Sequence, residues 1–337
     1  EIAMQAFQFH HATEPAQRVQ KAMPKATGYD VVVSVEAVAV NPVDLKVKSM
    51  IQDNANGKVI GWDAAGIITD VGEQCQNFQV GDKVFYAGDI GRDGCYASHQ
   101  LVDSRIIAKA PKSLQPHQAA ALPLTALTAW ESLFDRLKID ADKDRNKTLL
   151  IIGAAGGVGS MAIQLAKQLT SLKVIATASR PETQKWCEKL GADVVISHKG
   201  VLKDNYQAAN LPAADYILCL NDSDYYYPHM VELIAPQGLI ALVVSFQQPV
   251  DLNQLKNKSA GLVWEFMFTR PNMKTADIQQ QGQILQRIAE LADLNQLQPV
   301  SQQHFDQLTP QTLDQAHHLL SLGQTIGKIT LGALSDT

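Results

Sequence analysis

The pattern of hydrophobic and polar positions changes character along the chain. From Asp30 to about Ala110, short runs rich in valine and isoleucine alternate with glycine-marked turns. This pattern predicts a β-rich, barrel-like unit. Asn41-Pro42 and Ala110-Pro111 close two of its strands, because the residue before a proline is driven out of the helical region. From Gln115 to Leu137, alanine and leucine recur at helical spacing and predict one or two bridging helices.

A different pattern follows, in which short apolar, β-prone runs alternate with helical ones. The predicted strands are Thr148 to Ile152, Lys173 to Ala178, Val194 to Ile196, Tyr216 to Leu220 and Leu239 to Val244. The predicted helices are Gly157 to Leu169 and Thr183 to Leu190. Such alternation is typical of a parallel sheet with helices on both faces, an α/β fold. A glutamine-rich helix, about Thr275 to Asp293, then precedes a final strand-like segment, Gly327 to Leu331.

A run of glycines from Gly153 to Gly159 follows the predicted strand that ends at Ile152 and opens the next helix. Glycine permits a tight turn and a close approach of the backbone to a pyrophosphate, and the helix N-terminus offers unpaired N–H groups. The spacing G-x-x-G-x-x-G is one residue longer at its start than the best-known fingerprint. We expect a nicotinamide dinucleotide here, although a purely structural turn is the alternative. The residues expected to form the binding turn are Ala155, Gly156, Gly157 and Val158.

The end of the second strand of this unit bears on the choice of coenzyme. Chains that bind NAD usually carry a carboxylate there for the ribose hydroxyls, whereas this chain has Ser179 and Arg180, with no carboxylate before Glu182. A hydroxyl beside a guanidinium suits a 2′-phosphate, which predicts NADPH. Alternatively Arg180 lies in solvent, which would leave the preference open. Further coenzyme contacts are expected at the ends of later strands, from Leu220, Val244, Ser245 and Phe246.

Length and composition narrow the class of protein. The chain has 337 residues, of which 46% are hydrophobic and 19% charged, enough for two domains. A net charge of −5 with interspersed signs disfavours a nucleic-acid partner. The apolar runs are shorter than the roughly 20 residues of a membrane helix, and no signal peptide is recognisable, so we expect a cytoplasmic protein whose natural start is Met4. The 4 cysteines are scattered, and we expect reduced thiols.

Several motifs occur in order along nearly the whole chain. They are Asn41-Pro42-Val43-Asp44, Gly61-Trp62-Asp63-Ala64-Ala65-Gly66, Val80-Gly81-Asp82-Lys83-Val84, Leu122-Pro123-Leu124-Thr125-Ala126, the glycine turn and Gly327-Lys328-Ile329. Together they closely resemble the medium-chain dehydrogenase/reductase superfamily and, within it, the zinc-free quinone oxidoreductase-like branch. The resemblance implies a GroES-like catalytic domain, residues 1–125 and 271–337, and a Rossmann domain, residues 126–270. It also implies an active site in the cleft between the domains.

The zinc-dependent members of that superfamily differ from this chain at their metal ligands. They carry a cysteine at the position of Asn41 and a histidine-glutamate pair at Trp62-Asp63, and they often have a cysteine-rich lobe where this chain has only Cys95. Because a zinc site needs about four suitable ligands, we expect no metal. Hydride transfer then needs an electron-poor acceptor, such as a quinone or an α,β-unsaturated carbonyl compound. The alternatives are a zinc-type alcohol dehydrogenase and a non-catalytic NADPH-binding structural or regulatory protein.

The resemblance also implies roles for individual residues. Asn41 matches an asparagine that faces the nicotinamide, Asp44 an acid near the cleft, and Thr125 a threonine at the nicotinamide end. His198 stands where the branch often has a tyrosine near the adenosine, and Lys328 matches a basic position that can meet the pyrophosphate. Each residue also has a structural alternative. Asn41 would form a simple Asn-Pro turn, Asp44 would orient a neighbouring side chain, and Thr125 would be a helix N-cap. His198 would be a solvated loop residue, and Lys328 a lysine at a strand edge.

An aromatic segment from Leu262 to Thr269 has strand-like alternation with two large faces. In the family, the matching strand lies at the edge of the sheet and pairs with its copy in a partner subunit. We therefore expect a homodimer, and ordinary core packing is the alternative. Trp62, Tyr86 and Phe268 are candidates for an apolar substrate pocket but are equally typical of core.

Overall fold

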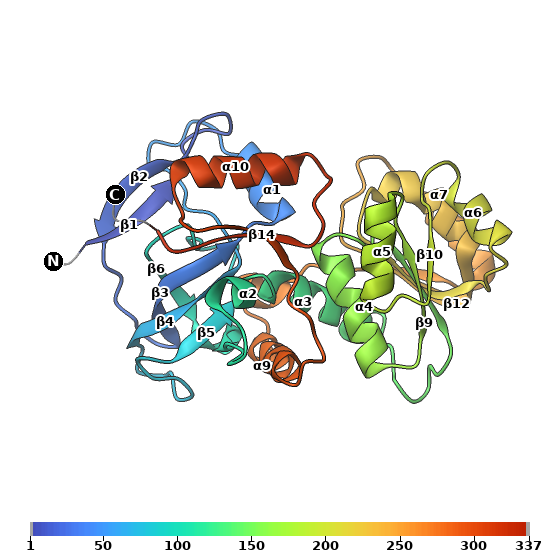
Figure 1. The fold of residues 1–337 in the computed structure, drawn as a ribbon, viewed down its shortest axis with the longest axis horizontal. Coiled ribbons are helices and arrows are strands. Elements are labelled where there is room, and N and C mark those ends of the chain that lie inside the picture. The colour runs from blue at the N-terminus through green and yellow to red at the C-terminus, as the bar shows by residue number, and fades with distance from the viewer. Residues whose placement is uncertain (1–2, 335–337) are drawn as a thin grey trace. The chain divides into compact units, whose positions relative to one another are not determined.

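The computed structural model describes residues 3–334 and divides the chain into two compact units (Figure 1). Unit 1 comprises Glu1–Leu127 and Phe268–Thr337, and unit 2 comprises Thr128–Met267. The chain therefore begins unit 1, builds all of unit 2 and returns to complete unit 1. Among the described residues, no helix is both long and apolar enough to cross a membrane.

Unit 2 contains a sheet in which six strands, all within the described residues, run parallel. Its order is β10-β9-β8-β11-β12-β13. The strands are β8 (Thr148–Ile152), β9 (Lys173–Thr177), β10 (Val194–Ile196), β11 (Ala214–Cys219), β12 (Ile234–Leu242) and β13 (Gly261–Trp264). The chain moves outward from β8 to β10 and then outward from β11 to β13 on the other side. The switch point, where ligands bind in such sheets, is therefore the β8–β11 pair.

Helices cover both faces of this sheet, so the expected doubly wound architecture is confirmed. Figure 1 shows α4 and α5 on one face and α6 and α7 on the other. The helices are α4 (Gly157–Leu169), α5 (Pro181–Lys189), α6 (Leu202–Ala208), α7 (Ser223–Leu233), the 3-10 helix η3 (Leu252–Lys258) and the π-helix η2 (Glu131–Arg136). Every residue of β8 is buried, as expected for a strand covered on both sides.

Unit 1 is β-rich, as predicted from its turn-punctuated sequence. Its larger sheet has the order β14-β15-β3-β4-β5-β7, with β6 also paired to β3, and only the β14–β15 pair is parallel among the described strands. A separate antiparallel pair joins β1 and β2. The strands are β1 (Ala3–Gln8), β2 (Gln17–Ala22), β3 (Asp30–Ala39), β4 (Ala64–Val71), β5 (Lys83–Tyr86), β6 (His99–Asp103), β7 (Ala108–Lys109), β14 (Ser301–Phe305) and β15 (Lys328–Leu331).

The helices of unit 1 lie around this sheet, and α1, α2 and α10 each begin with a proline. Proline fits that place because the first N–H of a helix has no partner within the helix. They are α1 (Pro42–Ser49), α2 (Pro116–Ala120), α8 (Thr269–Met273), α9 (Gln280–Asp293), α10 (Pro310–Ser321) and the 3-10 helix η1 (Ser104–Ile106), with α3 (Pro123–Trp130) running from unit 1 into unit 2. The glutamine-rich helix α9 begins about one turn later than predicted.

Candidate active site

The glycine turn after β8 is shaped by its glycines in two different ways. A Cβ atom added to Gly159 would lie 2.3 Å from the carbonyl oxygen of Ala154, so helix α4 can approach the end of β8 only with glycine there. A Cβ added to Gly156, the N-cap of α4, would meet nothing within 4 Å. The N-terminus of α4 therefore opens onto free space beside an uncapped row of N–H groups. Such a helix end fits the pyrophosphate of a dinucleotide.

The other predicted coenzyme residues of unit 2 follow the carboxyl ends of its strands. Ser179 and Arg180 follow β9, and Nη1 of Arg180 lies 2.9 Å from Oε1 of Glu182. His198 follows β10, and its pKa is lowered by burial and by Lys199. Because β9 and β10 run parallel, Ser179, Arg180 and His198 lie at the same edge of the sheet.

Four more predicted contacts lie in the loops after β11 and β12, and they differ in exposure. Leu220 is half-buried, whereas Val244 and Ser245 are exposed. Phe246 packs edge to face against Tyr227 and Trp264, with ring centroids 5.8 Å apart in both cases. Phe246 therefore contributes to the hydrophobic core beside β12 and β13.

In unit 1, the strand order assembles a polar cluster from distant parts of the sequence. Strands β15 and β3 pair antiparallel with Thr330 opposite Ala39. In an antiparallel pair, two residues before Thr330 lie opposite two residues after Ala39, so Lys328 lies beside Asn41. The segment before β4 runs along the same place, since the N–H of Ala39 donates to the carbonyl of Asp63 at 3.1 Å. The Asn41, Asp63 and Lys328 side chains thus meet at one end of the sheet.

These three side chains form a closed set of hydrogen bonds, which we call the lysine cluster. The ammonium of Lys328 donates to Oδ1 of Asn41 and, at 3.0 Å, to Oδ2 of Asp63. The Asn41 amide donates to the same carboxylate oxygen at 3.1 Å. The second oxygen, Oδ1, accepts the backbone N–H of Leu124 at 2.9 Å, near the start of α3. Lys328 is 4% exposed, Asn41 1% and Asp63 0%.

The charges of the lysine cluster compensate each other within the protein interior. Burial raises the pKa of Asp63, while Lys328 and the N–H of Leu124 lower it. Three donors face this carboxyl group, and only the carboxylate offers acceptors to all of them. We therefore describe the pair as an ammonium and a carboxylate. Removing one partner would leave the other charge buried and unpaired, which is costly.

Asp44, predicted as a catalytic acid, lies beside this cluster in a second chain of hydrogen bonds. Its Oδ2 accepts the N–H of Asn41 at 2.8 Å and the hydroxyl of Tyr96 at 2.7 Å. The Tyr96 hydroxyl also lies 3.0 Å from Nε2 of His317 on α10. Burial raises the pKa of Asp44 to about 7, against the opposing effects of Tyr96, Asn41 and Lys328. Burial also lowers the pKa of His317 to about 4.

Sequence reasoning missed several members of this site. Tyr96 and His317 stand in no motif, and no spacing connects them to Asp44. Asp63 was noted only as the position of an absent metal ligand. Thr125 is buried, and its hydroxyl donates to the carbonyl oxygens of Leu122 at 3.3 Å and Ala121 at 3.4 Å. Thr125 is therefore bonded to the turn before it.

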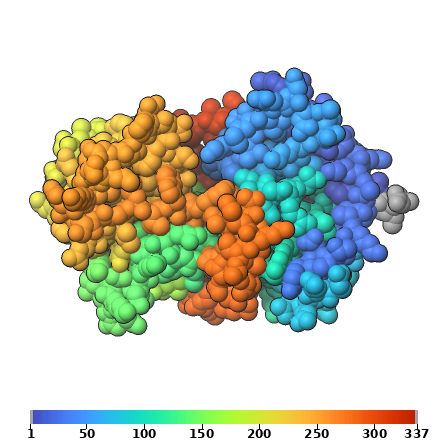
Figure 2. All heavy atoms as spheres, turned by 180° about the vertical axis from the view of Figure 1, so that it is seen from behind, coloured from blue at the N-terminus to red at the C-terminus, as the bar shows by residue number. Residues whose placement is uncertain are grey.

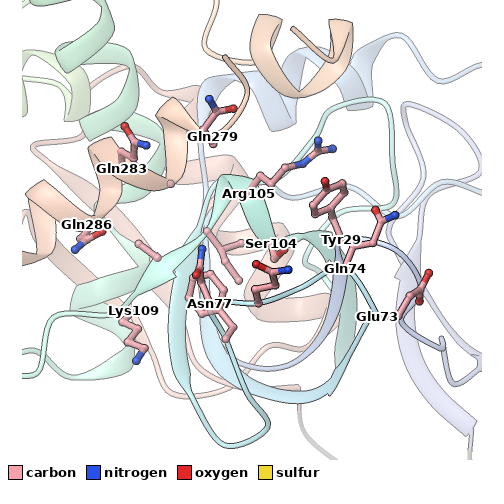
Figure 3. A pocket seen from close by; sticks show the side chains of 15 residues that line it. Tyr29, Glu73, Gln74, Asn77, Ser104, Arg105, Lys109, Gln279, Gln283 and Gln286 are labelled. Carbon is pink, nitrogen blue, oxygen red and sulfur yellow. The ribbon is translucent and has the colours of Figure 1, made fainter. Parts of the chain in front are cut away.

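A cavity of unit 1 lies away from these residues. It measures about 890 Å³, and its lining includes the amide side chains of Gln279, Gln283 and Gln286 (Figure 3). Arg105 stacks over the ring of Tyr29, 4.0 Å from its centroid, at the same cavity. None of the predicted catalytic or coenzyme residues is among its lining residues. This cavity is therefore separate from the lysine cluster.

Two protein families match parts of this chain. Residues 27–112 match the family described as alcohol dehydrogenase GroES-like domain, and residues 157–289 match the family described as zinc-binding dehydrogenase. A zinc-type alcohol dehydrogenase-like protein of Staphylococcus aureus is 44% identical over 310 residues, which cover 91% of this chain and 92% of that protein. The chain belongs to the medium-chain dehydrogenase/reductase superfamily. It is an oxidoreductase of that superfamily.

Two further relatives differ in how much of this chain they cover. A solved structure from Rhizobium etli, of a protein assigned as a zinc-dependent alcohol dehydrogenase, has a TM-score of 0.94 and 39% identity, with 99% of both chains covered. The 2-methylene-furan-3-one reductase of Solanum lycopersicum is 34% identical over 197 residues, covering 55% of this chain and 48% of that protein. The resemblance stated from the sequence motifs is confirmed at the level of superfamily and fold.

The names of the Staphylococcus aureus and Rhizobium etli proteins imply zinc, and the side chains of this chain do not fit it. Among residues 3–334, no three histidine, cysteine, aspartate or glutamate side chains are grouped so that they could hold a metal ion. The carboxylate of Asp63, at a position equivalent to a ligand in zinc-dependent members, is bonded to an ammonium. Cys95 lies nearby as a buried thiol, and its Sγ donates to the carbonyl of Asp63 at 3.4 Å. An ammonium and a divalent cation would repel each other at this position.

Proposed function

We propose that this protein is an NADPH-dependent reductase that works without a metal and reduces quinones or α,β-unsaturated carbonyl compounds. The observation that carries the proposal is the open N-terminus of α4 at Gly156, because it offers backbone N–H groups to a pyrophosphate. When bound, the coenzyme supplies a hydride. The residues of the chain then have to hold the coenzyme, orient the acceptor and stabilise the charge that develops on it.

Residues of unit 2 would bind the two phosphate-bearing parts of the coenzyme, the pyrophosphate and the 2′-phosphate. Gly156, Gly157 and Val158 would hold the pyrophosphate with their backbone N–H groups, because they open helix α4. Ser179 and Arg180 would hold the 2′-phosphate of NADPH, since a guanidinium matches phosphate oxygens with a fork of donors. In the structure Arg180 is paired with Glu182, which the phosphate would have to displace.

The proposed acceptors are compounds that can be reduced with the help of hydrogen-bond donors and without a metal ion. A saturated ketone or an alcohol needs strong polarisation of its oxygen, which the zinc-dependent relatives obtain from the metal. Quinones and α,β-unsaturated carbonyl compounds instead delocalise the incoming electron pair, so hydrogen-bond donors suffice. The relation to a tomato reductase named for such an unsaturated ketone supports this choice of acceptor.

We also propose that the protein is a homodimer joined through β13. This strand lies at the end of the strand order of unit 2, with β12 as its neighbour. The yellow to orange surface in Figure 2 belongs to this part of the sequence, in which Trp264 and Leu252 are exposed. Analytical ultracentrifugation should give a dimer for the wild type and a monomer for Trp264→Arg. A monomeric wild type would contradict the proposal.

The coenzyme is tested by titrating NADPH and NADH against the protein and following tryptophan fluorescence. We expect NADPH to bind at least about tenfold more tightly, and Arg180→Glu to abolish that preference because it replaces attraction to the phosphate by repulsion. Equal affinities in the wild type would contradict the choice of coenzyme.

A panel of quinones, enones, enals and simple alcohols, run with the wild type and with Asn41→Ala, tests the reaction. Turnover of quinones or enones that falls in Asn41→Ala supports the proposal. Coenzyme binding without turnover of any acceptor would instead favour a structural or regulatory protein. Alcohol oxidation together with one tightly held zinc ion per chain would favour a zinc-type alcohol dehydrogenase.

A further inference from the structure

Two members of the lysine cluster, Asn41 and Asp63, stand where the zinc-dependent members carry residues of their metal site, and in this chain they hold the ammonium of Lys328. We infer that the ammonium of Lys328 is a catalytic group that stabilises the negative charge on the oxygen of the acceptor. This inference rests on the proposed reduction of a quinone or an unsaturated carbonyl compound. It gives Lys328 a role different from the pyrophosphate contact that the sequence resemblance implies.

The position of the ammonium is fixed from two sides. Asn41 and Asp63 each accept one of its N–H bonds. Asp63 is held in turn by the N–H of Leu124 at 2.9 Å and by the Asn41 amide at 3.1 Å. The backbone of Asn41 is held by the carboxyl group of Asp44 at 2.8 Å. A donor fixed in this way needs no reorganisation when charge develops on a substrate, which is the main source of electrostatic catalysis.

The ammonium has donor capacity left for a substrate. A lysine ammonium carries three N–H bonds, and two of them point to Asn41 and Asp63. Among the residues that the structure describes, no third acceptor is bonded to it. An acceptor oxygen is the natural partner for the third N–H bond.

The charges in the cluster suit this task. Asp63 balances the charge of Lys328 while the site is empty, so a neutral pair is buried. When a hydride enters the acceptor carbon, a π-electron pair moves to the acceptor oxygen, and that oxygen becomes an anion that the ammonium binds. Water then supplies the proton that completes the reduced product, and Lys328 remains an ammonium. Hydrogen bonds to a charged donor are roughly twice as strong as those between neutral groups.

The first test compares Lys328→Met with the double variant Asp63→Asn/Lys328→Met, which removes both charges and leaves no unpaired one. Lys21→Met is the control, because Lys21 pairs with Asp93 at the surface of the same unit. We expect kcat to fall by about 10²- to 10³-fold in the double variant, as for the loss of an oxyanion donor. The affinity for NADPH should stay within about threefold of the wild type. An unchanged kcat would overturn the inference, and so would a tenfold loss of NADPH affinity, which would make Lys328 a coenzyme contact.

The second test needs neither coenzyme nor turnover. 4-Nitrophenol resembles a charged acceptor, and its absorption distinguishes phenolate from phenol. The wild type should bind it with its apparent pKa lowered, and the double variant should lose that shift. A wild type that leaves the ionisation of bound 4-nitrophenol unchanged would overturn the inference. Phenolate stabilisation in a protein that reduces none of the proposed acceptors would support the cation site and contradict only the proposed function.

Discussion

The glycine turn of unit 2 and the lysine cluster of unit 1 are both proposed to hold negative charge, and they are built in opposite ways. The turn uses backbone N–H groups from one continuous stretch, Gly153 to Gly159, and contains no charged side chain. The cluster uses side chains from three distant segments and buries an ammonium and a carboxylate. The turn therefore depends on the absence of side chains, whereas the cluster depends on their pairing.

This difference predicts that substitutions impair the two sites in different ways. A backbone site loses its function when a Cβ atom enters it, and its stability is affected only where that atom collides with the fold. A buried ion pair loses stability as soon as one partner is removed, because the remaining charge stays in a medium that solvates it poorly. The following variants are chosen to separate these two behaviours.

The largest effect on stability is expected for Lys328→Met. The substitution leaves the carboxylate of Asp63 buried, and we expect a loss of about 3–5 kcal/mol in the free energy of unfolding. Asp63→Asn/Lys328→Met should recover most of that loss, since no charge is then left unpaired. Urea denaturation of both variants measures the difference. A single variant as stable as the double one would show that the pair is not buried as described.

A somewhat smaller effect is expected from Gly159→Ala, because the new Cβ atom would lie 2.3 Å from a backbone oxygen of Ala154. Backbone atoms cannot move aside easily, so we expect unit 2 to lose about 2–3 kcal/mol. Gly156→Ala is the matched control, since its Cβ meets nothing within 4 Å. Thermal unfolding should show a lower Tm for Gly159→Ala only, and equal Tm values would refute the packing argument.

A pH-dependent effect is expected in unit 1 from Asp44, whose pKa is raised to about 7 by burial. In the unfolded chain the carboxyl group has a pKa of about 3.9. Between these values the folded state holds the proton more tightly, so this group stabilises the fold at low pH, and its contribution falls by up to about 1.4 kcal/mol per pH unit as the pH rises towards 7. Asp44→Asn should lack this decline, whereas the surface variant Asp93→Asn should keep it. Urea denaturation between pH 4.5 and 7.5 provides the measurement, and parallel curves for wild type and Asp44→Asn would contradict the assignment.

His317 contributes a pH dependence of stability that is opposite in sign to that of Asp44. Its pKa is lowered to about 4, so the unfolded chain takes up a proton first as the pH falls. The stability contributed by the neutral ring is present above about pH 6.5 and is lost as the pH falls towards 4. His317→Gln should therefore flatten this acid-side loss. The same denaturation series would contradict this sign if the variant lost stability towards pH 4 as steeply as the wild type.

The smallest effect is expected at the coenzyme end of unit 2. Glu182 lies 2.9 Å from Arg180, and both side chains are substantially exposed. Exposed pairs of this kind contribute about 0–1 kcal/mol, so Glu182→Gln should raise NADPH affinity by no more than about fivefold and leave NADH affinity unchanged. Glu188→Gln, on the same helix, serves as the control. Weaker NADPH binding in Glu182→Gln would mean that Glu182 orients Arg180 for the phosphate.

The sequence was most informative where structure is local. Strand β8, the turn and helix α4 follow one another, and both elements begin and end at the predicted residues. Strands β2 and β14 were missed, because their polar, half-exposed sequences lack a clear alternation. Helix α7 was missed because Pro228 interrupts its pattern.

The lysine cluster could not be predicted, although Asn41 and Lys328 had each been singled out. Their contact depends on β15 pairing with β3, and that pairing joins residues from opposite ends of the chain. Periodicity and motif spacing carry no information about such a long-range register. The same limitation applies to the contact between Tyr96 and His317.

The most direct test asks whether the glycine turn, and not the lysine cluster, binds the coenzyme. It compares the dissociation constants of NADPH for Gly156→Ala, Asp63→Asn/Lys328→Met and the wild type. We expect at least tenfold weaker binding for the glycine variant and a change of less than about threefold for the double variant. The reverse order, with the coenzyme lost from the double variant and retained by the glycine variant, would contradict this expectation.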